Sequence, residues 1–279
     1  MPNDYARTMP ELHGLIYPRT PTGAASIVPP PPWHYSGDML TVEYRTDPAN
    51  VAELLPDPLR PADDDPGAVA VVWAEWQSCS DSFDELLDPA RAQYKEVFVV
   101  VRCQYEGQTY SRAAYIWVDK DFALARGVLQ GYPKKLAEIW MTRPVALGVA
   151  GPRLAPGGRF GATVSTFGRR LVEARFTITG RAETAGFVNG HPMIHSRQMP
   201  SIELDGGDSL DELVTMRGYD VELGPVHSGT VEIDLFDVPT EELIRLAPLE
   251  MIGGYYRQIA TSWNGGSTLH AEPNPKAAR

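Results

Sequence analysis

Glycine and proline interrupt this sequence at short intervals and leave little room for long helices. The chain contains 25 glycines and 25 prolines. The runs between them, such as 39–46 and 67–78, are rich in β-branched and aromatic residues. Runs of this kind favour β-strands, and Gly and Pro favour the turns that join them. Strands do not alternate with long helices, so the sequence does not predict a parallel βαβ fold.

Two hairpins and a few short helices are expected. Segment 94–119 predicts a hairpin that turns at Glu106-Gly107, and 159–181 predicts another with Gly168 near its turn. Further strands are expected at 192–204, 216–223 and 227–236. Short helices are expected at 48–55, 120–129 and 239–246, the first capped by Asp47. The sequence predicts a β-rich α+β fold with a curved or closed antiparallel sheet.

The chain is expected to form one domain with two less regular ends. Residues 1–36 contain a proline run and predict an extended arm that packs on the domain or, alternatively, meets a partner. Residues 37–263 carry the strands and helices of the domain. Residues 264–279 predict a loose tail.

Charge and composition exclude several classes of protein. Lys and Arg number 25 against 36 Asp and Glu, which gives a net charge of −11. Nucleic-acid binding is not expected, because it needs a basic face. No apolar run is long enough to span a bilayer, and the first residues lack the apolar core of a secretion signal. We therefore expect a cytoplasmic protein without a membrane partner.

The motifs that hold common cofactors are missing from the sequence. It contains neither a dinucleotide-binding G-x-G-x-x-G after a strand nor a phosphate-binding P-loop, and no G-x-S-x-G nucleophile elbow. His191 and His195 are four residues apart, but Pro192 between them argues against a helical metal pair. The two cysteines, Cys79 and Cys103, cannot form a disulfide framework. We expect no metal and no cofactor.

A pair of adjacent lysines stands out instead. The chain has only five lysines, yet Lys134 and Lys135 are neighbours after Pro133. A neutral lysine can condense with a ketone to an imine, which withdraws electrons from the adjacent carbon. At about 6 Å and an effective dielectric of about 20, a second ammonium disfavours the charged amine by about 2.8 kcal/mol. The alternative is that both lysines are simply solvated beside a proline turn.

The segments GYPKKL (131–136), EYRTD (43–47) and LLPDPL (54–59) resemble the acetoacetate decarboxylase-like superfamily. Weaker resemblance continues through 227–254. The resemblance implies that family's barrel-like fold, with Lys134 as the imine-forming residue and Lys135 as its electrostatic partner. The segment Tyr94-Lys95-Glu96 resembles the family's active-site glutamate segment, so Glu96 is a candidate proton carrier. The alternative for Glu96 is an exposed acid on a strand.

The sequence departs from true decarboxylases at two positions. Gly37 stands where they have an arginine, and Val71 stands where they have a glutamate, although Glu75 is nearby. Arg126 and Gln130 precede Lys134 and resemble branches that act on α-keto acids, the aldolase-dehydratases and cyclase-dehydratases. Both side chains can bind a keto-acid carboxylate. The alternative for Arg126 is a cation at a helix C-terminus.

Two tyrosines near the C-terminus are further candidates. Tyr255 and Tyr256 follow a Gly-Gly pair, and a phenol there could carry a proton. Adjacent residues of a strand face opposite sides, so at most one enters a pocket. We assign the role to Tyr256 in preference to Tyr255.

The sequence therefore predicts a lyase that needs no cofactor, an aldolase-dehydratase that condenses pyruvate or a related α-keto acid with an aldehyde. The alternatives are a β-keto acid decarboxylase, a cyclase or dehydratase of a hydroxylated α-keto acid, and a non-catalytic binder of small molecules. The resemblance also implies a homo-oligomer.

Overall fold

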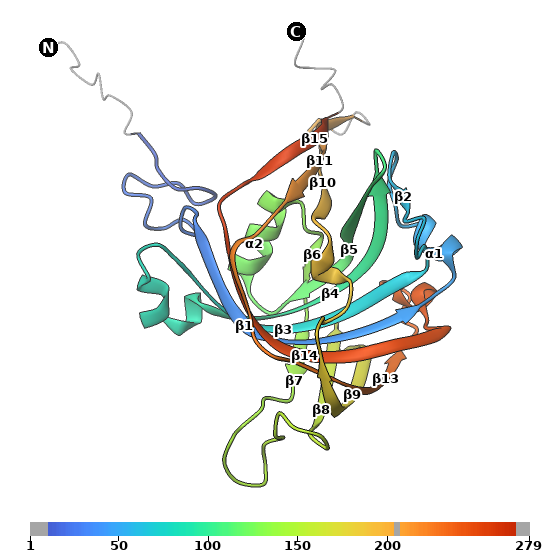
Figure 1. Ribbon diagram of the computed structural model, residues 1–279. Helices are drawn as coiled ribbons and strands as arrows, with labels where there is room; N and C mark the ends of the chain where they lie inside the picture. Colours follow the sequence, from blue (N-terminus) through green and yellow to red (C-terminus); the bar gives the residue numbers. More distant parts are fainter. Residues whose placement is uncertain (1–10, 204–206, 272–279) are drawn as a thin grey trace, which may run out of the picture.

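The computed structural model describes residues 11–203 and 207–271, and its centre is one large curved sheet (Figure 1). Within these residues the sheet has 15 strands, in the order β15-β11-β10-β5-β4-β3-β1-β14-β13-β9-β8-β7, with β12, β2 and β6 paired at its side. The two ends of this path do not pair, so the sheet is curved and not closed. The β-rich α+β prediction is confirmed. Most strand pairs are antiparallel as expected, but the sheet is mixed, because β5 pairs in parallel with β10 and with β6.

The central strands are long and the peripheral ones short. The strands are β1 (Trp33–Arg45), β2 (Arg60–Pro61), β3 (Ala68–Ser80), β4 (Gln93–Tyr105), β5 (Gln108–Val118), β6 (Lys134–Leu136), β7 (Glu138–Met141), β8 (Arg159–Thr166), β9 (Arg169–Ala182), β10 (Met193–Pro200), β11 (Asp208–Met216), β12 (Tyr219–Leu223), β13 (Val226–Leu235), β14 (Glu250–Trp263) and β15 (Gly266–Ala271).

Both predicted hairpins are present. β4 and β5 turn at Glu106 and Gly107, which have φ angles of 49° and 81°. β8 and β9 turn at Phe167 and Gly168, with φ angles of 48° and 72°. Two consecutive residues with positive φ match the right-handed twist of the flanking strands, which is why these turns form tight hairpins.

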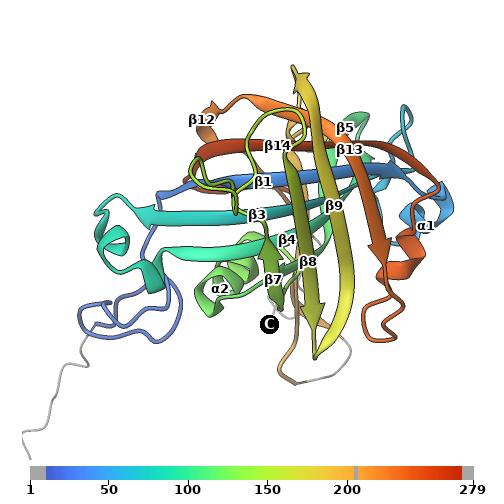
Figure 2. The same ribbon diagram turned by 90° about the horizontal axis from the view of Figure 1, so that it is seen from below.

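The middle of the sheet is buried on both faces. Along β3, Val69, Val71 and Trp73 belong to one core cluster, whereas Ala70 and Val72 belong to another. Successive side chains of a strand point to opposite faces, so these clusters lie on the two sides of the sheet. Figure 2 shows β8, β9 and β13 crossing the face of the first cluster. Helix α2 covers the second.

Two of the three predicted helices are shorter than expected, and one has the expected length. α1 spans Pro48–Ala52, and the Asp47 side chain accepts from the Ala49 N–H at 2.9 Å as expected of an N-cap. α2 spans Asp121–Gln130, close to the expected 120–129. The third predicted helix is only a 3-10 turn, η4 (Leu243–Leu246). The remaining short turns are η1 (Asp84–Leu87), η2 (Pro89–Arg91) and η3 (Val188–Gly190).

Parts of both end segments, 11–36 and 264–271, lie within the described residues. In the arm, Ile16, Ile27 and Val28 pack on the second core cluster, and β1 already begins at Trp33. The loose tail is wrong for Gly266–Ala271, because these residues form β15 on the edge of β11. The rest of the predicted tail, 272–279, lies outside the described residues. None of the described helices has the length and apolarity needed to cross a membrane.

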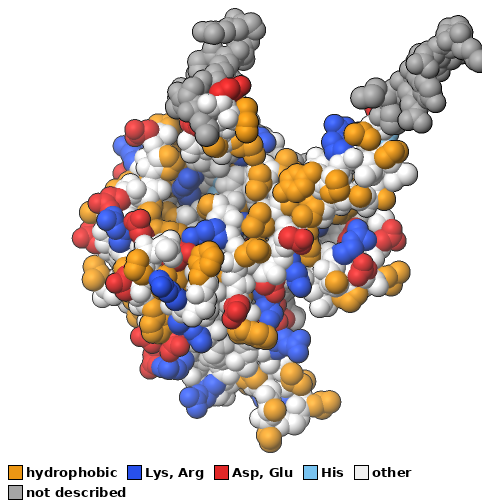
Figure 3. Space-filling view, turned by 180° about the vertical axis from the view of Figure 1, so that it is seen from behind, with side chains coloured by type: hydrophobic (Ala, Val, Ile, Leu, Met, Phe, Trp, Pro, Cys, Tyr) orange, Lys and Arg blue, Asp and Glu red, His pale blue; other side chains and the backbone are white. Residues whose placement is uncertain are grey.

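The loop between β7 and β8 projects from the body of the protein. Figure 3 shows this projection with apolar side chains on its surface. Leu147 and Val149 are almost fully exposed there, and Val145 is half exposed. Exposed apolar side chains that cluster in this way are characteristic of contact surfaces.

Candidate active site

Lys134 is held on the second face of the sheet by the short strand β6, which pairs in parallel with β5. Its side chain is only 7% exposed, and its Nζ lies 2.6 Å from Oε2 of Glu96 on β4. The rings of Tyr94 and Tyr132 lie 5.7 and 5.5 Å from the same nitrogen. The amine is therefore enclosed by one carboxylate and two aromatic rings.

Helix α2 reaches this lysine through a glycine. A β-carbon built on Gly127 would stand 2.7 Å from both Cγ and Cδ of Lys134, so only glycine lets the helix lie this close. The helix ends at Gly131, whose φ of 80° is the left-handed conformation that glycine favours. The chain then turns directly into Pro133 and β6. Helix, turn and strand together fix the position of Lys134.

Arg126 and Gln130 lie one turn apart on α2 and are both buried. The Arg126 side chain donates through Nη1 to Oγ of Ser78 at 2.9 Å, and its guanidinium lies 4.8 Å from the Trp33 ring. Its Nε has no hydrogen-bond partner among the described residues. The alternative of a cation at the helix C-terminus is not supported, because the last turn of α2 holds no basic residue and Arg126 is only 2% exposed.

The phenols of the site stay neutral at physiological pH. Burial raises the pKa of Tyr35 to about 12, with Glu96 raising it and Arg126 lowering it. Burial, reinforced by Glu96, also raises the pKa of Tyr94 and of Tyr132. All three hydroxyls can therefore donate hydrogen bonds.

Formal charges in the cluster are one carboxylate, Glu96, against the cations Lys134 and Arg126. The excess of one positive charge suits an anion with a single carboxylate.

Lys135 is not the neighbour that the sequence analysis expected. Consecutive strand residues face opposite sides, and the Lys135 ammonium is bound by the carboxylate of Glu241. It also lies over the ring of Trp117, a member of the first core cluster. The geometry therefore does not support Lys135 as the cation that crowds Lys134, because a buried carboxylate on the other face compensates its charge.

The preference for Tyr256 is not supported either. Tyr256 is fully buried in the first core cluster, and its hydroxyl donates to Oδ1 of Asp38 at 2.6 Å. Tyr255 is on the face of Lys134, but its hydroxyl lies beside Gly253, and burial and the nearby Glu43 raise its pKa. The phenols that contact the lysine region are those of Tyr94 and Tyr132.

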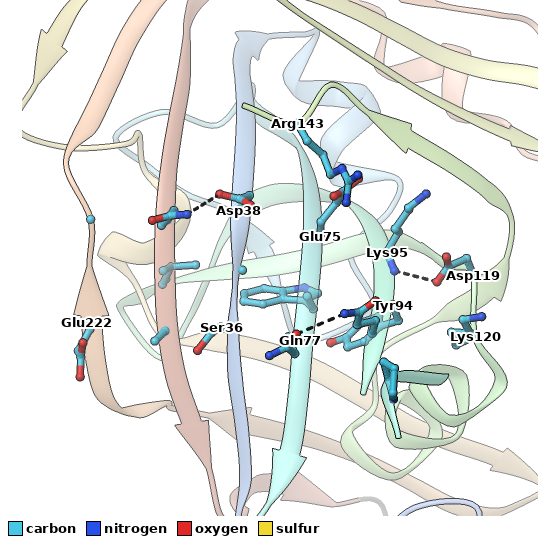
Figure 4. Close-up of a pocket in the computed structure, with 18 of the residues that line it drawn as sticks. Ser36, Asp38, Glu75, Gln77, Tyr94, Lys95, Asp119, Lys120, Arg143 and Glu222 are labelled. Carbon is cyan, nitrogen blue, oxygen red and sulfur yellow. Dashed lines mark hydrogen bonds between the residues drawn. The ribbon is translucent and has the colours of Figure 1, made fainter. Parts of the chain in front are cut away.

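A separate cleft of about 990 Å³ lies at the ends of β1, β3 and β4. Figure 4 shows it lined by side chains of both signs, among them Asp38, Glu75 and Lys95. Lys134 is not among its lining residues, whereas Tyr94 borders both the cleft and the lysine. This cleft is therefore distinct from the enclosure around Lys134.

The fold and the enclosed lysine agree with the family match. The acetoacetate decarboxylase family matches residues 16–272, and the chain belongs to this family. It is therefore an enzyme of the acetoacetate decarboxylase-like superfamily. No curated protein sequence matches it significantly.

Among solved structures, the enduracididine biosynthesis enzyme MppR is similar, with 37% identity and a TM-score of 0.88 for the form with bound HEPES, over 95% of this chain and 97% of MppR. An acetoacetate decarboxylase-like enzyme from Sphingomonas wittichii is 29% identical, with a TM-score of 0.84, over 93% of this chain and 100% of that one. Acetoacetate decarboxylase from Legionella pneumophila shares the fold at 16% identity and a TM-score of 0.72, over 87% and 89%. The chain is closer to the MppR branch than to true acetoacetate decarboxylases.

Several residues of the site escaped the sequence analysis. Tyr94 stands two positions before Glu96, and Tyr132 stands two positions before Lys134. Residues two apart on a strand share a face, so the strand pattern could have identified Tyr94 from Glu96. Tyr132 precedes a proline turn, so no strand period applies to it. His195, considered in the sequence only as half of a metal pair, comes from β10.

Proposed function

We propose that this enzyme is a lyase that needs no cofactor and joins pyruvate or a related α-keto acid to an aldehyde through an imine on Lys134. The observation that carries the proposal is the enclosed amine of Lys134, 2.6 Å from the carboxylate of Glu96. The comparisons support it, since MppR has been solved with pyruvate and with the condensation product of pyruvate and imidazole 4-carboxaldehyde.

Imine formation begins with the neutral amine. Glu96 can accept one proton from the Lys134 ammonium along their short contact. The free amine then attacks the ketone carbon of pyruvate. The proton held by Glu96 leaves with the carbinol hydroxyl as water, which gives the protonated imine and returns Glu96 to its carboxylate form.

The substrate carboxylate is assigned to Arg126 and Gln130. Both lie one helical turn apart on the face of α2 that carries Gly127, against which Lys134 packs. Nε of Arg126 has no hydrogen-bond partner within the part of the chain that the structure describes, and a guanidinium binds a carboxylate through paired hydrogen bonds. The surplus positive charge of the cluster favours an α-keto acid over a neutral ketone.

Carbon–carbon bond formation follows from the imine. The Glu96 carboxylate removes a proton from the methyl carbon of bound pyruvate, and the electron pair of the broken C–H bond moves into the imine to give an enamine. The enamine carbon attacks the aldehyde carbon, and the resulting alkoxide takes the proton back. Loss of a second proton and of hydroxide, as water, gives the unsaturated product, which hydrolysis releases from the lysine. Glu96 is the proposed carrier of these protons, with Tyr94 and Tyr132 as neighbouring donors.

Decarboxylation of a β-keto acid is the second candidate, because the family takes its name from that reaction. Gly37 and Val71 weigh against it, since they stand where the decarboxylases have charged residues. A cyclase or dehydratase of a hydroxylated α-keto acid would use the same imine, and a non-catalytic binder would use none.

The decisive experiment is borohydride reduction in the presence of pyruvate, followed by peptide mass mapping. We expect one reduced adduct on Lys134, absent in Lys134→Arg and unchanged in the control Lys95→Arg. An adduct elsewhere, or none, would overturn the assignment. Ultraviolet absorbance of the enone formed from pyruvate and imidazole 4-carboxaldehyde then identifies condensation, and CO₂ release from acetoacetate identifies decarboxylation.

We also propose a homo-oligomer. The exposed apolar side chains of the β7–β8 loop, Val145, Leu147 and Val149, supply a suitable contact surface. Sedimentation of the full chain tests this: a purely monomeric protein contradicts it.

A further inference from the structure

His195 is a fully buried imidazole that nothing in the described fold satisfies. Its exposed fraction is 0%, and neither Nδ1 nor Nε2 has a hydrogen-bond partner among the described residues. Leaving a buried polar group unpaired destabilises the folded state, because the group loses its hydrogen bonds to water. An apolar side chain would fill this core position without leaving polar atoms unpaired. Both ring nitrogens of His195 are therefore available to hydrogen-bond a ligand.

The position of His195 links it to the lysine. It lies on β10, next to β5 in the sheet order, and β5 carries β6 and therefore Lys134. Its ring centroid is 4.1 Å from that of Tyr132, and Tyr132 in turn lies 5.5 Å from Lys134 Nζ. One aromatic ring thus contacts both the free imidazole and the imine-forming amine.

The imidazole is neutral in this position. Burial lowers the pKa of His195 well below its ordinary value, and the cations Arg112 and Lys134 lower it further. A neutral imidazole has one N–H donor and one acceptor nitrogen. Neutral histidine donors of this kind polarise carbonyl groups in other enzymes, where they stabilise a developing negative oxygen without giving up the proton.

We propose that His195 binds the aldehyde acceptor by donating its N–H to the carbonyl oxygen, and so becomes the specificity-determining contact for the second substrate. This inference rests on the proposed function. When the enamine carbon bonds to the aldehyde carbon, the carbonyl π pair moves to the oxygen, and the His195 N–H stabilises that charge. Glu96, which holds the proton taken from the methyl carbon, then protonates the alkoxide. His195 itself neither gains nor loses a proton in this step.

Two half-reactions separate this role from the lysine chemistry. Exchange of the pyruvate methyl protons in D₂O, followed by NMR, needs only the imine and its base, whereas enone formation also needs the aldehyde. In His195→Phe, which keeps a ring against Tyr132, we expect methyl exchange and borohydride trapping on Lys134 within about threefold of wild type. We expect kcat/KM for imidazole 4-carboxaldehyde to fall about 10²–10³-fold, as when one oxyanion donor is removed.

Two further variants complete the test. His195→Gln, whose amide restores a donor, should recover at least tenfold of the lost condensation activity. His227→Phe is the matched control, because His227 is a buried histidine beside Tyr256 on the other face of the sheet, and it should change neither half-reaction. Unchanged condensation in a folded His195→Phe overturns the proposal, and so does an equal loss of methyl exchange. Absence of trapping in the wild-type enzyme would instead refute the proposed function itself.

Discussion

The side chain of Lys134 lies directly against the backbone of Gly127, with no space for a β-carbon between helix α2 and the lysine. In most helices a glycine-to-alanine change stabilises the protein through better helix propensity. Here the added carbon would stand 2.7 Å from Cγ and Cδ of the lysine. The amine is therefore positioned by the absence of a side chain on the neighbouring helix.

Gly127→Ala should displace the lysine and lower activity. We expect kcat for condensation to fall at least tenfold and stability to fall by about 1–3 kcal/mol, because the helix or the lysine must shift to relieve the clash. Thermal unfolding and steady-state kinetics measure both. Gly180→Ala is the control, since nothing lies within 4 Å of the carbon it would add. A stabilised and fully active Gly127→Ala enzyme would contradict the packing.

Glu96→Gln should uncouple imine formation from proton transfer. Removing the carboxylate withdraws the charge that stabilises the Lys134 ammonium at 2.6 Å, so borohydride trapping should persist. Exchange of the pyruvate methyl protons should slow about 10²–10⁴-fold, as expected for loss of a general base. Glu75→Gln, which changes a side chain of the separate cleft, should leave both signals unchanged. Methyl-proton exchange at the wild-type rate in Glu96→Gln would show that another residue is the general base.

Lys135 should matter for stability rather than chemistry. Its partner Glu241 is 2% exposed, so Lys135→Met leaves a buried carboxylate uncompensated. Because Lys135 itself is about half exposed, we expect a loss of only about 1–2 kcal/mol, or roughly 3–6 °C in Tm. Trapping of pyruvate on Lys134 should stay within about threefold of wild type.

The double variant Lys135→Met/Glu241→Gln completes this cycle. It should recover part of the lost Tm, because it removes the unpaired charge. A large loss of trapping with an unchanged Tm would instead restore Lys135 as the electrostatic neighbour of Lys134.

Arg126→Lys should weaken the binding of the keto acid. The ammonium keeps the charge but loses the paired hydrogen bonds that a guanidinium forms with a carboxylate. We expect KM for pyruvate to rise about 10–100-fold, with KM for the aldehyde nearly constant. Arg143→Lys, in the separate cleft, is the control and should change neither constant. A rise in KM for the aldehyde alone would indicate that Arg126 binds the aldehyde and not the keto acid.

Glu43 should make stability depend on pH. Burial raises its pKa from an ordinary 4.5 to about 7, although the Phe187 N–H at 2.5 Å and Arg102 lower it, and Asp65 raises it. Folding therefore favours the protonated form, and this contribution is complete below about 4.5 and is lost as pH rises through about 7. Tyr255, which also faces Glu43, stays protonated over this range.

The variant Glu43→Gln isolates this effect, because its amide oxygen can still accept the Phe187 N–H. The Tm of wild type relative to Glu43→Gln should decline between about pH 4.5 and 7 and then level off. Parallel Tm curves for the two proteins would show that Glu43 titrates at its ordinary value.

The sequence by itself determined the local structure and the reactive motif. Gly107 and Gly168 predict their hairpins because a tight turn needs positive φ at fixed positions. Asp47 predicts its helix start for a similarly local reason. The rare Lys-Lys pair after a proline, together with its family resemblance, singled out Lys134.

Only the tertiary structure decided what surrounds that lysine. Lys135 meets Glu241 across 106 positions of chain, and Tyr256 meets Asp38 across 218. Period-two alternation predicts that neighbours face opposite sides, but which side becomes the site depends on how α2 and β10 pack on the sheet. His195 contacts Tyr132 for the same reason: long-range packing, which no local pattern encodes, brings its strand to the lysine.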